Sequence, residues 1–121
     1  MKNENRKDVL LIKDMLLAIE NIYEFTNNIT IENFATNDLI QAAVERKFEI
    51  IGEAAGRVSA SCKKEFHNVN WEVLRAFRNF LIHEYHRIDI AQVWTTILSD
   101  LPTLKEQMED ILEAISKDET L

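Results

Sequence analysis

Apolar residues recur at intervals of three and four positions along most of the chain, which is the spacing of one face of an α-helix. The first such run predicts a helix from about 7 to 28. Its apolar stripe consists of Val9, Ile12, Leu16, Ile19 and Tyr23. Two asparagines and a β-branched run then weaken the helical pattern, so we expect a connector that passes through 34–37.

A second helix is expected to begin at Asp38, the predicted N-cap, with Gln41 completing a capping box, and to run to about Ser61. Both glycines of the chain, Gly52 and Gly56, lie inside it on one face. Glycine destabilises a helix interior by up to about 1 kcal/mol relative to alanine. We therefore expect another backbone, from the first helix, the third helix or a second subunit, to approach this face closely. The alternative is that both glycines are simply tolerated.

A polar loop is expected at 63–70, followed by a third helix over 71–87. A fourth helix is expected to begin at Asp89, because Gln92 three positions later repeats the capping-box pattern. Pro102 must kink or restart this helix, since its ring removes one backbone hydrogen bond. The apolar stripe then continues to an acidic tail.

Composition supports a helical fold. The 121 residues include only two glycines and one proline, too few for the turns of a β-sandwich or barrel. With 46% apolar residues the chain is not a disordered one. No run approaches the ~18 apolar residues of a membrane span, and no cleavage site follows the first residues, so we expect a cytoplasmic protein. These patterns predict a single all-α domain over 1–121, a bundle of four to five helices.

Charge is distributed unevenly along the chain. The formal net charge is −7, from 14 basic and 21 acidic residues, which argues against nucleic-acid binding by bulk charge. The exception is the predicted third helix, where three arginines accompany two of the three histidines. These arginines are Arg75, Arg78 and Arg87. A solvated helix face explains such a cluster without any function, so charge alone does not identify a site.

The helical geometry separates the candidate groups. Asn79, His83 and Arg87 share one face of the predicted helix, whereas His83 lies roughly 140° around the axis from Arg78 at ~100° per residue. One helix therefore does not easily aim Arg78 and His83 at one small substrate. Either the helix breaks near His83, or two copies meet so that one complements the other. We expect a homodimer paired around this helix, because two-fold dimers are the commonest oligomers.

Arginine and histidine together suit the cleavage of RNA. Arginine offers a planar, permanently charged fork that grips a phosphate. Histidine takes up and returns a proton near neutral pH, as a base for the 2′-hydroxyl or an acid for the leaving oxygen. A second imidazole can come from the two-fold copy. This scheme requires no metal.

Other kinds of site are disfavoured. His83 and His86 have no second pair of metal ligands beside them, and His67 is expected to be an exposed loop residue, so we expect no metal. Cys62, the single cysteine, excludes an intrachain disulfide and is expected to pack rather than to act as a nucleophile. No glycine-rich phosphate loop is present, and we expect no cofactor.

Two further features have ordinary structural interpretations. Trp71 is most simply a core or interface residue. Glu49 and Glu53, four apart on the second helix, are expected to form a solvated stripe, although one of them could orient Arg78 or Arg46 through an ion pair. Neither glutamate is assigned to the active site.

Residues 78–85, Arg-Asn-Phe-Leu-Ile-His-Glu-Tyr, resemble the Arg-x4-His-x-Tyr motif of the HepT-like toxins in the HEPN superfamily. The similarity extends over most of the chain. The block 49–55 resembles the second-helix signature of that family, and 89–102 resembles its last helix. The short motif is weak alone, but it is specific when it stands in register with these two blocks.

The resemblance implies a homodimeric helical bundle whose two motif copies form a metal-independent ribonuclease site between subunits. It implies that Arg78 and His83 are catalytic and that Asn79 supports them. It also implies a toxin–antitoxin system, in which a nucleotidyltransferase antitoxin of the MntA type transfers AMP onto Tyr85. The bulky anion would then block RNA beside the cationic site. Toxin and antitoxin together can form a larger hetero-oligomer.

Two other functional hypotheses remain open at this point. The chain could be a non-catalytic nucleotide-binding protein or the accessory subunit of a nucleotidyltransferase, an interpretation that the overall acidity favours slightly. Alternatively, Arg78, His83 and Tyr85 could form a polar network that only stabilises a dimer.

Overall fold

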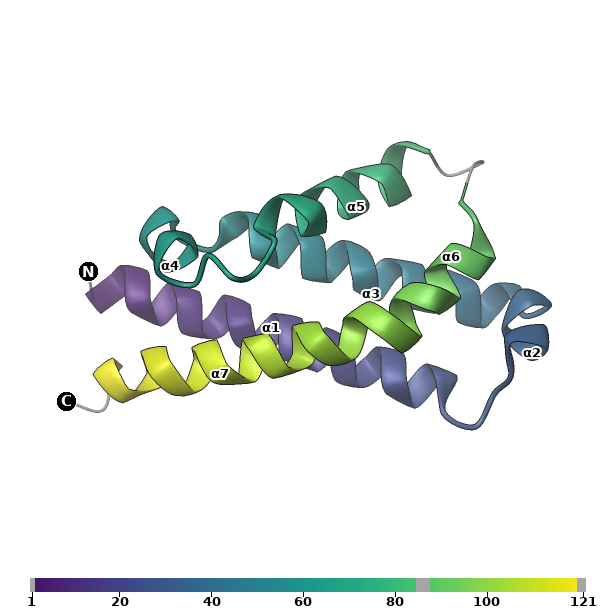
Figure 1. Cartoon of the computed structure of the whole chain (residues 1–121), viewed down its shortest axis with the longest axis horizontal. Coiled ribbons are helices and arrows are strands. Elements are labelled where there is room, and N and C mark those ends of the chain that lie inside the picture. The colour runs from purple at the N-terminus through teal and green to yellow at the C-terminus, as the bar shows by residue number, and fades with distance from the viewer. Residues whose placement is uncertain (1, 85–87, 120–121) are drawn as a thin grey trace.

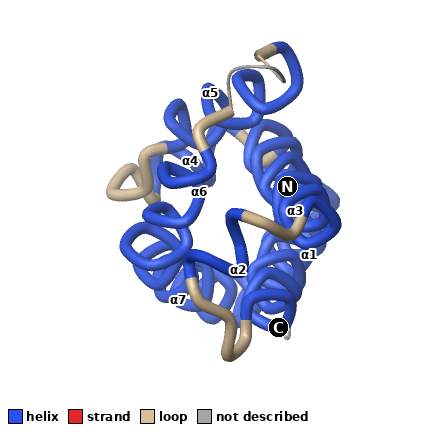
Figure 2. Tube along the Cα trace, turned by 90° about the vertical axis from the view of Figure 1, so that its right-hand side faces the viewer, coloured by secondary structure: helices blue, strands red, loops and turns tan. Residues whose placement is uncertain are grey.

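A computed structural model describes residues 2–84 and 88–119, and all the secondary structure in these ranges is helical (Figures 1 and 2). The four longest helices are α1 (Lys2–Thr26), α3 (Asp38–Arg57), α5 (Trp71–His83) and α7 (Leu101–Glu119). The shorter elements are α2 (Ile31–Ala35), α4 (Ala60–Glu65), α6 (Ile90–Thr95) and the π-helix η2 (Thr96–Asp100). The predicted all-α fold is confirmed. No helix in the described part of the chain is long and apolar enough to cross a membrane.

The long helices form an elongated bundle around α1. Helix α1 packs against both α3 and α7, and α5 lies on the outer side of α3 (Figure 1). The core lies mainly among α1, α3 and α7, where Ile12, Ile51 and Met108 are almost completely buried. Helix α5, which carries the candidate residues, is therefore the outermost of the long helices.

Helix α1 begins five residues before its predicted start and ends at Thr26, two residues before its predicted end. Contacts with other helices extend its polar first turn, because Asn5 Nδ2 donates to the Ile115 carbonyl at 3.1 Å and Ser61 Oγ donates to Glu4 Oε1 at 2.6 Å. Asn28 then takes a φ of 61°, a left-handed conformation that asparagine adopts more readily than most residues.

The expected connector at 34–37 is partly wrong, because residues 31–35 form α2. Thr30 caps this helix by accepting from the Asn33 N–H, and the fully buried Phe34 packs against Trp94 with ring centroids 5.1 Å apart. The N-cap of α3 is Asn37 rather than Asp38. The amide of Gln41 donates to the Phe34 carbonyl at 2.8 Å, so it joins α3 to α2.

Helix α3 ends at Arg57, before its predicted end at Ser61, and α4 occupies part of the expected loop. The buried Asp8 carboxylate causes this break, since it accepts hydrogen bonds from Ser59 N at 2.9 Å and Ser59 Oγ at 2.6 Å. Ser59 Oγ in turn accepts from Cys62 N at 3.2 Å and so caps α4. Local sequence patterns do not predict this contact, because 51 positions separate Asp8 from Ser59.

A new α-helix starts beside Pro102, as predicted, since α7 begins at Leu101. Asp89 is the N-cap of α6, also as predicted, and accepts from the Ala91 and Gln92 N–H groups. The π-helix η2 separates α6 from α7, and the Leu101 N–H bonds to the Thr96 carbonyl five residues earlier. The wider turn accommodates the proline ring, which would collide with a carbonyl in a regular α-helix.

Candidate active site

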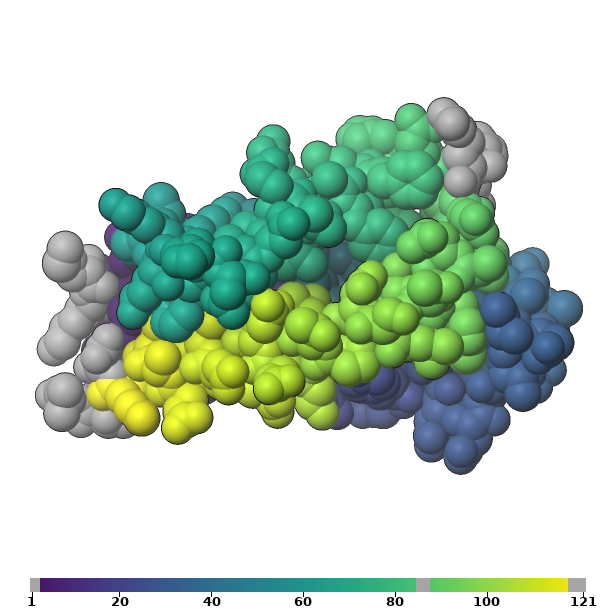
Figure 3. Space-filling view, viewed as in Figure 1, coloured from purple at the N-terminus to yellow at the C-terminus, as the bar shows by residue number. Residues whose placement is uncertain are grey.

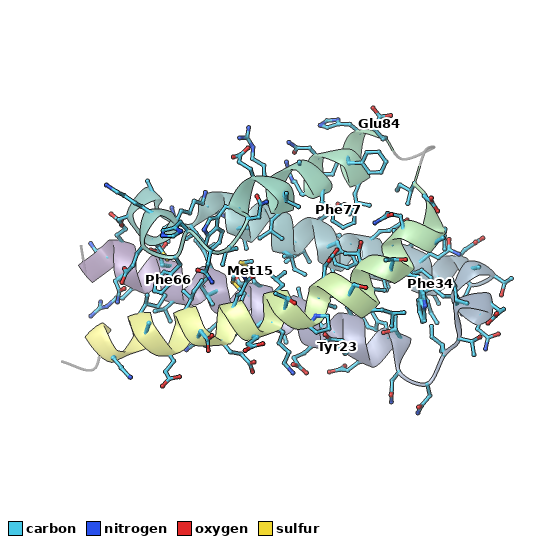
Figure 4. The ribbon with its side chains drawn as sticks, in the orientation of Figure 1. Met15, Tyr23, Phe34, Phe66, Phe77 and Glu84 are labelled. Carbon is cyan, nitrogen blue, oxygen red and sulfur yellow. The ribbon has the colours of Figure 1, made fainter. Side chains whose placement is uncertain are left out.

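Helix α5 is amphipathic and packs on α3 through its apolar face. Asn70 caps its first turn by accepting from Val73 N at 3.2 Å. Phe77, labelled in Figure 4, meets Phe48 of α3 edge to face with ring centroids 5.3 Å apart. Leu81 is buried. The helix ends at His83, and the Glu84 N–H still bonds to the Phe80 carbonyl at 2.8 Å. Helix α5 therefore ends four positions before its predicted end, with Glu84 as its C-cap, and the remaining predicted residues, 85–87, lie outside the described part of the chain.

Gly52 brings the backbones of α3 and α5 together. A Cβ at this position would collide with Cβ of Arg78 and would lie 2.8 Å from the Leu74 carbonyl oxygen. The predicted close approach is thus confirmed for Gly52, with α5 as the neighbour. At Gly56 no heavy atom of the described chain lies within 4 Å of a Cβ placed there, so neither of the two predicted helices approaches it.

Arg78 is half-buried and is held beside α3 by this close contact. Its Nη1 donates to Asn79 Oδ1 at 3.0 Å, whereas its Nε is buried and finds no acceptor in the described part of the protein. Arg78 also forms no ion pair with a carboxylate there. A buried donor without a partner is rare in folded proteins and needs an explanation. A phosphate oxygen is a suitable acceptor for such a guanidinium.

His83 is exposed at the last position of α5. Two exposed apolar residues flank it, since Phe80 and Ile82 are each 39% exposed. Helix α5 ends at His83 rather than before it, so the break does not turn this imidazole toward Arg78. The two residues remain roughly 140° apart around one helix axis, and a single chain does not aim them at the same point.

Some candidate residues lie outside the described part of the chain. These are Tyr85, His86 and Arg87. Among the remaining residues, no group of three or more histidine, cysteine, aspartate or glutamate side chains is placed to hold a metal ion. His67 lies in the loop after α4 and is exposed, as predicted.

Arg78 lines a hollow of about 320 Å³ between α3, α4 and α5. We call it the cationic groove, and its lining residues are Gly52, Glu53, Gly56, Arg57, Lys63, Trp71, Glu72, Arg75 and Arg78. Sequence reasoning places Arg75 near the motif but does not find Arg57 or Lys63. The break in the chain between α3 and α4 brings these two residues to α5. The glycine at position 56, which no packing contact requires, is the only signal of the groove in the sequence.

A larger hollow of about 450 Å³ lies on the other side of α5 (Figure 3). It separates α5 from η2 and α7, and its walls are largely apolar, with Val73, Phe77 and Leu104 among them. Neither Arg78 nor His83 lines this hollow. The charged candidate residues therefore belong to the cationic groove and to the end of α5.

The predicted solvated stripe of Glu49 and Glu53 is confirmed only for Glu53, which is exposed. The Glu49 side chain is 23% exposed and pairs with Arg46 at 3.4 Å, one of the two ion pairs that the sequence allowed. The predicted packing role of Cys62 is confirmed, because the residue is buried. Burial, together with the negative charge of Asp8, raises the pKa of the Cys62 thiol to about 11. The thiol therefore stays protonated near neutral pH, which suits a packing residue and not a nucleophile.

The family model described as "Ribonuclease HepT-like" matches residues 15–111. A protein of Thermococcus cleftensis named "Probable ribonuclease HepT" is 36% identical over 88% of this chain and 96% of its own length. A protein of Methanocaldococcus jannaschii named "Gamma-glutamylcyclotransferase and putative RNase" is 34% identical over 93% of the chain, which spans about half (51%) of that relative. No solved structure matches the chain at a significant level.

Proposed function

Because this chain belongs to the ribonuclease HepT-like family, we propose that it is a ribonuclease and the toxin of a toxin–antitoxin pair. The observation that supports this proposal most directly is the incomplete set of acceptors around the Arg78 guanidinium. Its guanidinium has no carboxylate partner in the described residues, and its Nε lacks any acceptor there. An arginine left in this condition is ready to bind a phosphate.

Arg78 and His83 carry the proposed reaction. His83 removes the proton of a 2′-hydroxyl, whose oxygen attacks the adjacent phosphorus, and the bond from phosphorus to the 5′-oxygen breaks. A second histidine returns a proton to the departing 5′-oxygen, so that a 2′,3′-cyclic phosphate and a 5′-hydroxyl result. Arg78 stabilises the negative charge that develops on the phosphorus oxygens. Asn79 orients Arg78 through the 3.0 Å hydrogen bond to Nη1.

The proposed site requires two copies of the chain. One α5 directs Arg78 and His83 to different sides, so Arg78 of one subunit works with His83 of the other. The exposed Phe80 and Ile82 lie next to His83 and provide apolar surface for such pairing. The second copy also supplies the second imidazole that the reaction needs.

Regulation is assigned to Tyr85. The proposed partner is a nucleotidyltransferase antitoxin of the MntA type, which transfers AMP from ATP onto the Tyr85 hydroxyl. The added phosphate and nucleoside place negative charge and bulk two positions from His83 and exclude RNA by repulsion and occupancy. Tyr85→Phe would remove the acceptor oxygen and leave an aromatic ring.

Growth and total-RNA integrity after induction of the chain alone test the proposal. We expect growth arrest and RNA cleavage, and we expect Arg78→Ala and His83→Ala to abolish both. Arg46→Ala is the matched control, because it removes a cation that pairs with Glu49 away from the site. Coexpression with the antitoxin should rescue growth of the parent chain but not of Tyr85→Phe.

A different result would overturn this function. Healthy cells with intact RNA, in the presence of folded, dimeric and unmodified protein, would exclude a toxin. Retention of a nucleotide by that protein would favour the accessory-subunit hypothesis, to which the net charge of −7 lends some support.

A further inference from the structure

The cationic groove has an excess of positive charge on an acidic protein. Four basic side chains line it, from Arg57, Lys63, Arg75 and Arg78, against the two carboxylates of Glu53 and Glu72. The local formal charge is therefore +2, whereas the whole chain carries −7. Like charges that gather on a folded surface repel each other, so they are stabilised by an anionic ligand.

These cations are poorly neutralised within the protein. Arg75 approaches Glu72 only at 3.7 Å, and both side chains are strongly exposed, at 63% and 85%. Lys63 Nζ donates at 3.2 Å to the carbonyl of Gly56, which is a neutral acceptor. Arg57 forms no ion pair or side-chain hydrogen bond with the residues that the structure describes. An exposed ion pair of the Arg75 type contributes about 0–1 kcal/mol, too little to hold that arginine away from a ligand.

Gly56 keeps the groove open. A glycine within a helix costs about 0.5–1 kcal/mol relative to alanine. Gly52 offsets this cost through the close contact with α5, but Gly56 has no neighbour within 4 Å of a Cβ. Packing within the described chain therefore does not explain Gly56, whereas an occupant of the groove would. A side chain at position 56 would fill the space that such an occupant needs.

Trp71 adds an aromatic surface to the same groove. The residue is half-buried, and its Nε1 already donates to the Phe66 carbonyl at 3.1 Å. The indole is thus fixed in orientation, with its polar atom satisfied. Cationic side chains beside an aromatic ring are the combination that binds single-stranded nucleic acids without sequence preference.

We infer that the cationic groove binds the backbone of single-stranded RNA beside the cleaved bond, with phosphates on Arg57, Lys63 and Arg75 and a base against Trp71. This inference rests on the proposed ribonuclease function. Arg78 belongs both to the groove and to the proposed reacting site, and the other residues that line the groove include Lys63 of α4 but not His83. RNA would therefore cross α5 at Arg78 and continue over the bare surface at Gly56.

Fluorescence anisotropy with a labelled single-stranded RNA tests the groove, with His83→Ala in every protein so that the RNA stays intact. Gly56→Leu fills the groove, and Arg57→Glu reverses one of its charges. Each is expected to weaken RNA binding about tenfold, and Arg57→Glu should also lower the salt dependence of log Kd by at least ~0.7. Gly56→Ala fills less of the groove and should weaken binding less than Gly56→Leu does. Lys13→Glu, at an exposed position on α1, is the matched control and should change Kd less than about twofold.

Urea unfolding of each variant separates lost binding from lost structure. Because nothing lies near Gly56, both of its variants should be at least as stable as the parent. Normal RNA binding by folded Gly56→Leu and Arg57→Glu would overturn the inference, as would a parent protein that does not bind RNA. Cleavage by the chain with His83 intact is measured separately. Groove-dependent binding without any cleavage would contradict the proposed ribonuclease and leave the groove assignment standing.

Discussion

At the scale of single residues, the two glycines of α3 have opposite surroundings although they lie on one face of one helix. Gly52 is buried where α3 meets α5, and Gly56 is exposed in the wall of the cationic groove. Substitution of each glycine by alanine therefore probes a different property at each position. At Gly52 it tests the space between two backbones, and at Gly56 it tests helix propensity.

We expect Gly52→Ala to destabilise the protein by about 1–3 kcal/mol, since α5 must move to accommodate the methyl group. Because Cβ of Arg78 is the atom in contact, the same change should reduce RNA cleavage. Gly56→Ala should instead stabilise the protein by up to about 1 kcal/mol. Urea unfolding of the pair checks both signs, and equal effects would contradict the close contact at Gly52.

Cys62 makes the stability of the folded protein depend on pH in the alkaline range. Its pKa rises from 9.0 in the unfolded chain to about 11 in the folded protein, chiefly through burial. The folded state therefore keeps the proton more firmly, so this contribution is complete below pH 9.0 and declines as pH rises toward about 11. We expect the free energy of unfolding to fall by about 1–3 kcal/mol over this range.

Cys62→Ala is the control for this effect, because other groups also titrate at alkaline pH. The free energy of unfolding of the variant should decline less between pH 9.0 and about 11 than that of the parent does. Parallel decline in both proteins would mean that the thiol is not the responsible group.

At the scale of secondary-structure elements, one buried carboxylate determines where two helices end and begin. Asp8 of α1 is only 4% exposed and accepts two hydrogen bonds from Ser59, between α3 and α4. This contact fixes the break between α3 and α4. Arg57 lies before the break and Lys63 after it, and both line the cationic groove. The wall of the groove thus depends on a residue in another helix.

We expect Asp8→Ala to destabilise the protein by about 1–3 kcal/mol, because it leaves the Ser59 N–H and hydroxyl without their acceptor. Asp8→Asn, which retains one carbonyl oxygen, should cost less. Asp14→Ala, at an exposed position of the same helix, is the matched control. Hydrogen exchange should show reduced protection of the Cys62 amide in Asp8→Ala alone, and unchanged protection there would contradict this account of the break.

The long helices are predictable from sequence because their apolar spacing reflects burial against a neighbour. The short helices α2 and α4 are not, since five or six residues carry little periodicity and depend on caps at Thr30 and Ser59. Arg78 and His83 can be singled out from charge and motif within one segment. The cationic groove cannot, because its residues come from three helices and are assembled by the long-range contact at Asp8.

At the scale of the whole molecule, exposed apolar residues occur on several helices, and two of them lie near the end of α5 that carries His83. Phe80 and Ile82 are each 39% exposed there, on a helix whose packing partner within the chain is α3. Such residues on a single subunit are buried when a partner covers them. Pairing of two α5 helices would cover Phe80 and Ile82, and it is the arrangement that the proposed site requires.

Light scattering tests the pairing. We expect the parent chain to be a dimer and Phe80→Glu to be a monomer that no longer cleaves RNA, because a charge buried in an interface is strongly unfavourable. Leu10→Glu is the matched control, since Leu10 is 62% exposed on α1, which packs mainly against α3 and α7. A dimeric, folded Phe80→Glu would place the interface elsewhere.

The start of α1 and the end of α7 lie at the same end, or pole, of the bundle. Asn5 of α1 bonds to the Ile115 carbonyl of α7 at 3.1 Å, and both chain ends lie opposite the end of α5 marked by Glu84 (Figures 1 and 4). A second folded domain fused to either end, or a surface to which the protein is tethered, would meet this pole and not His83. A domain attached at either terminus would therefore leave uncovered the end of α5 that carries His83.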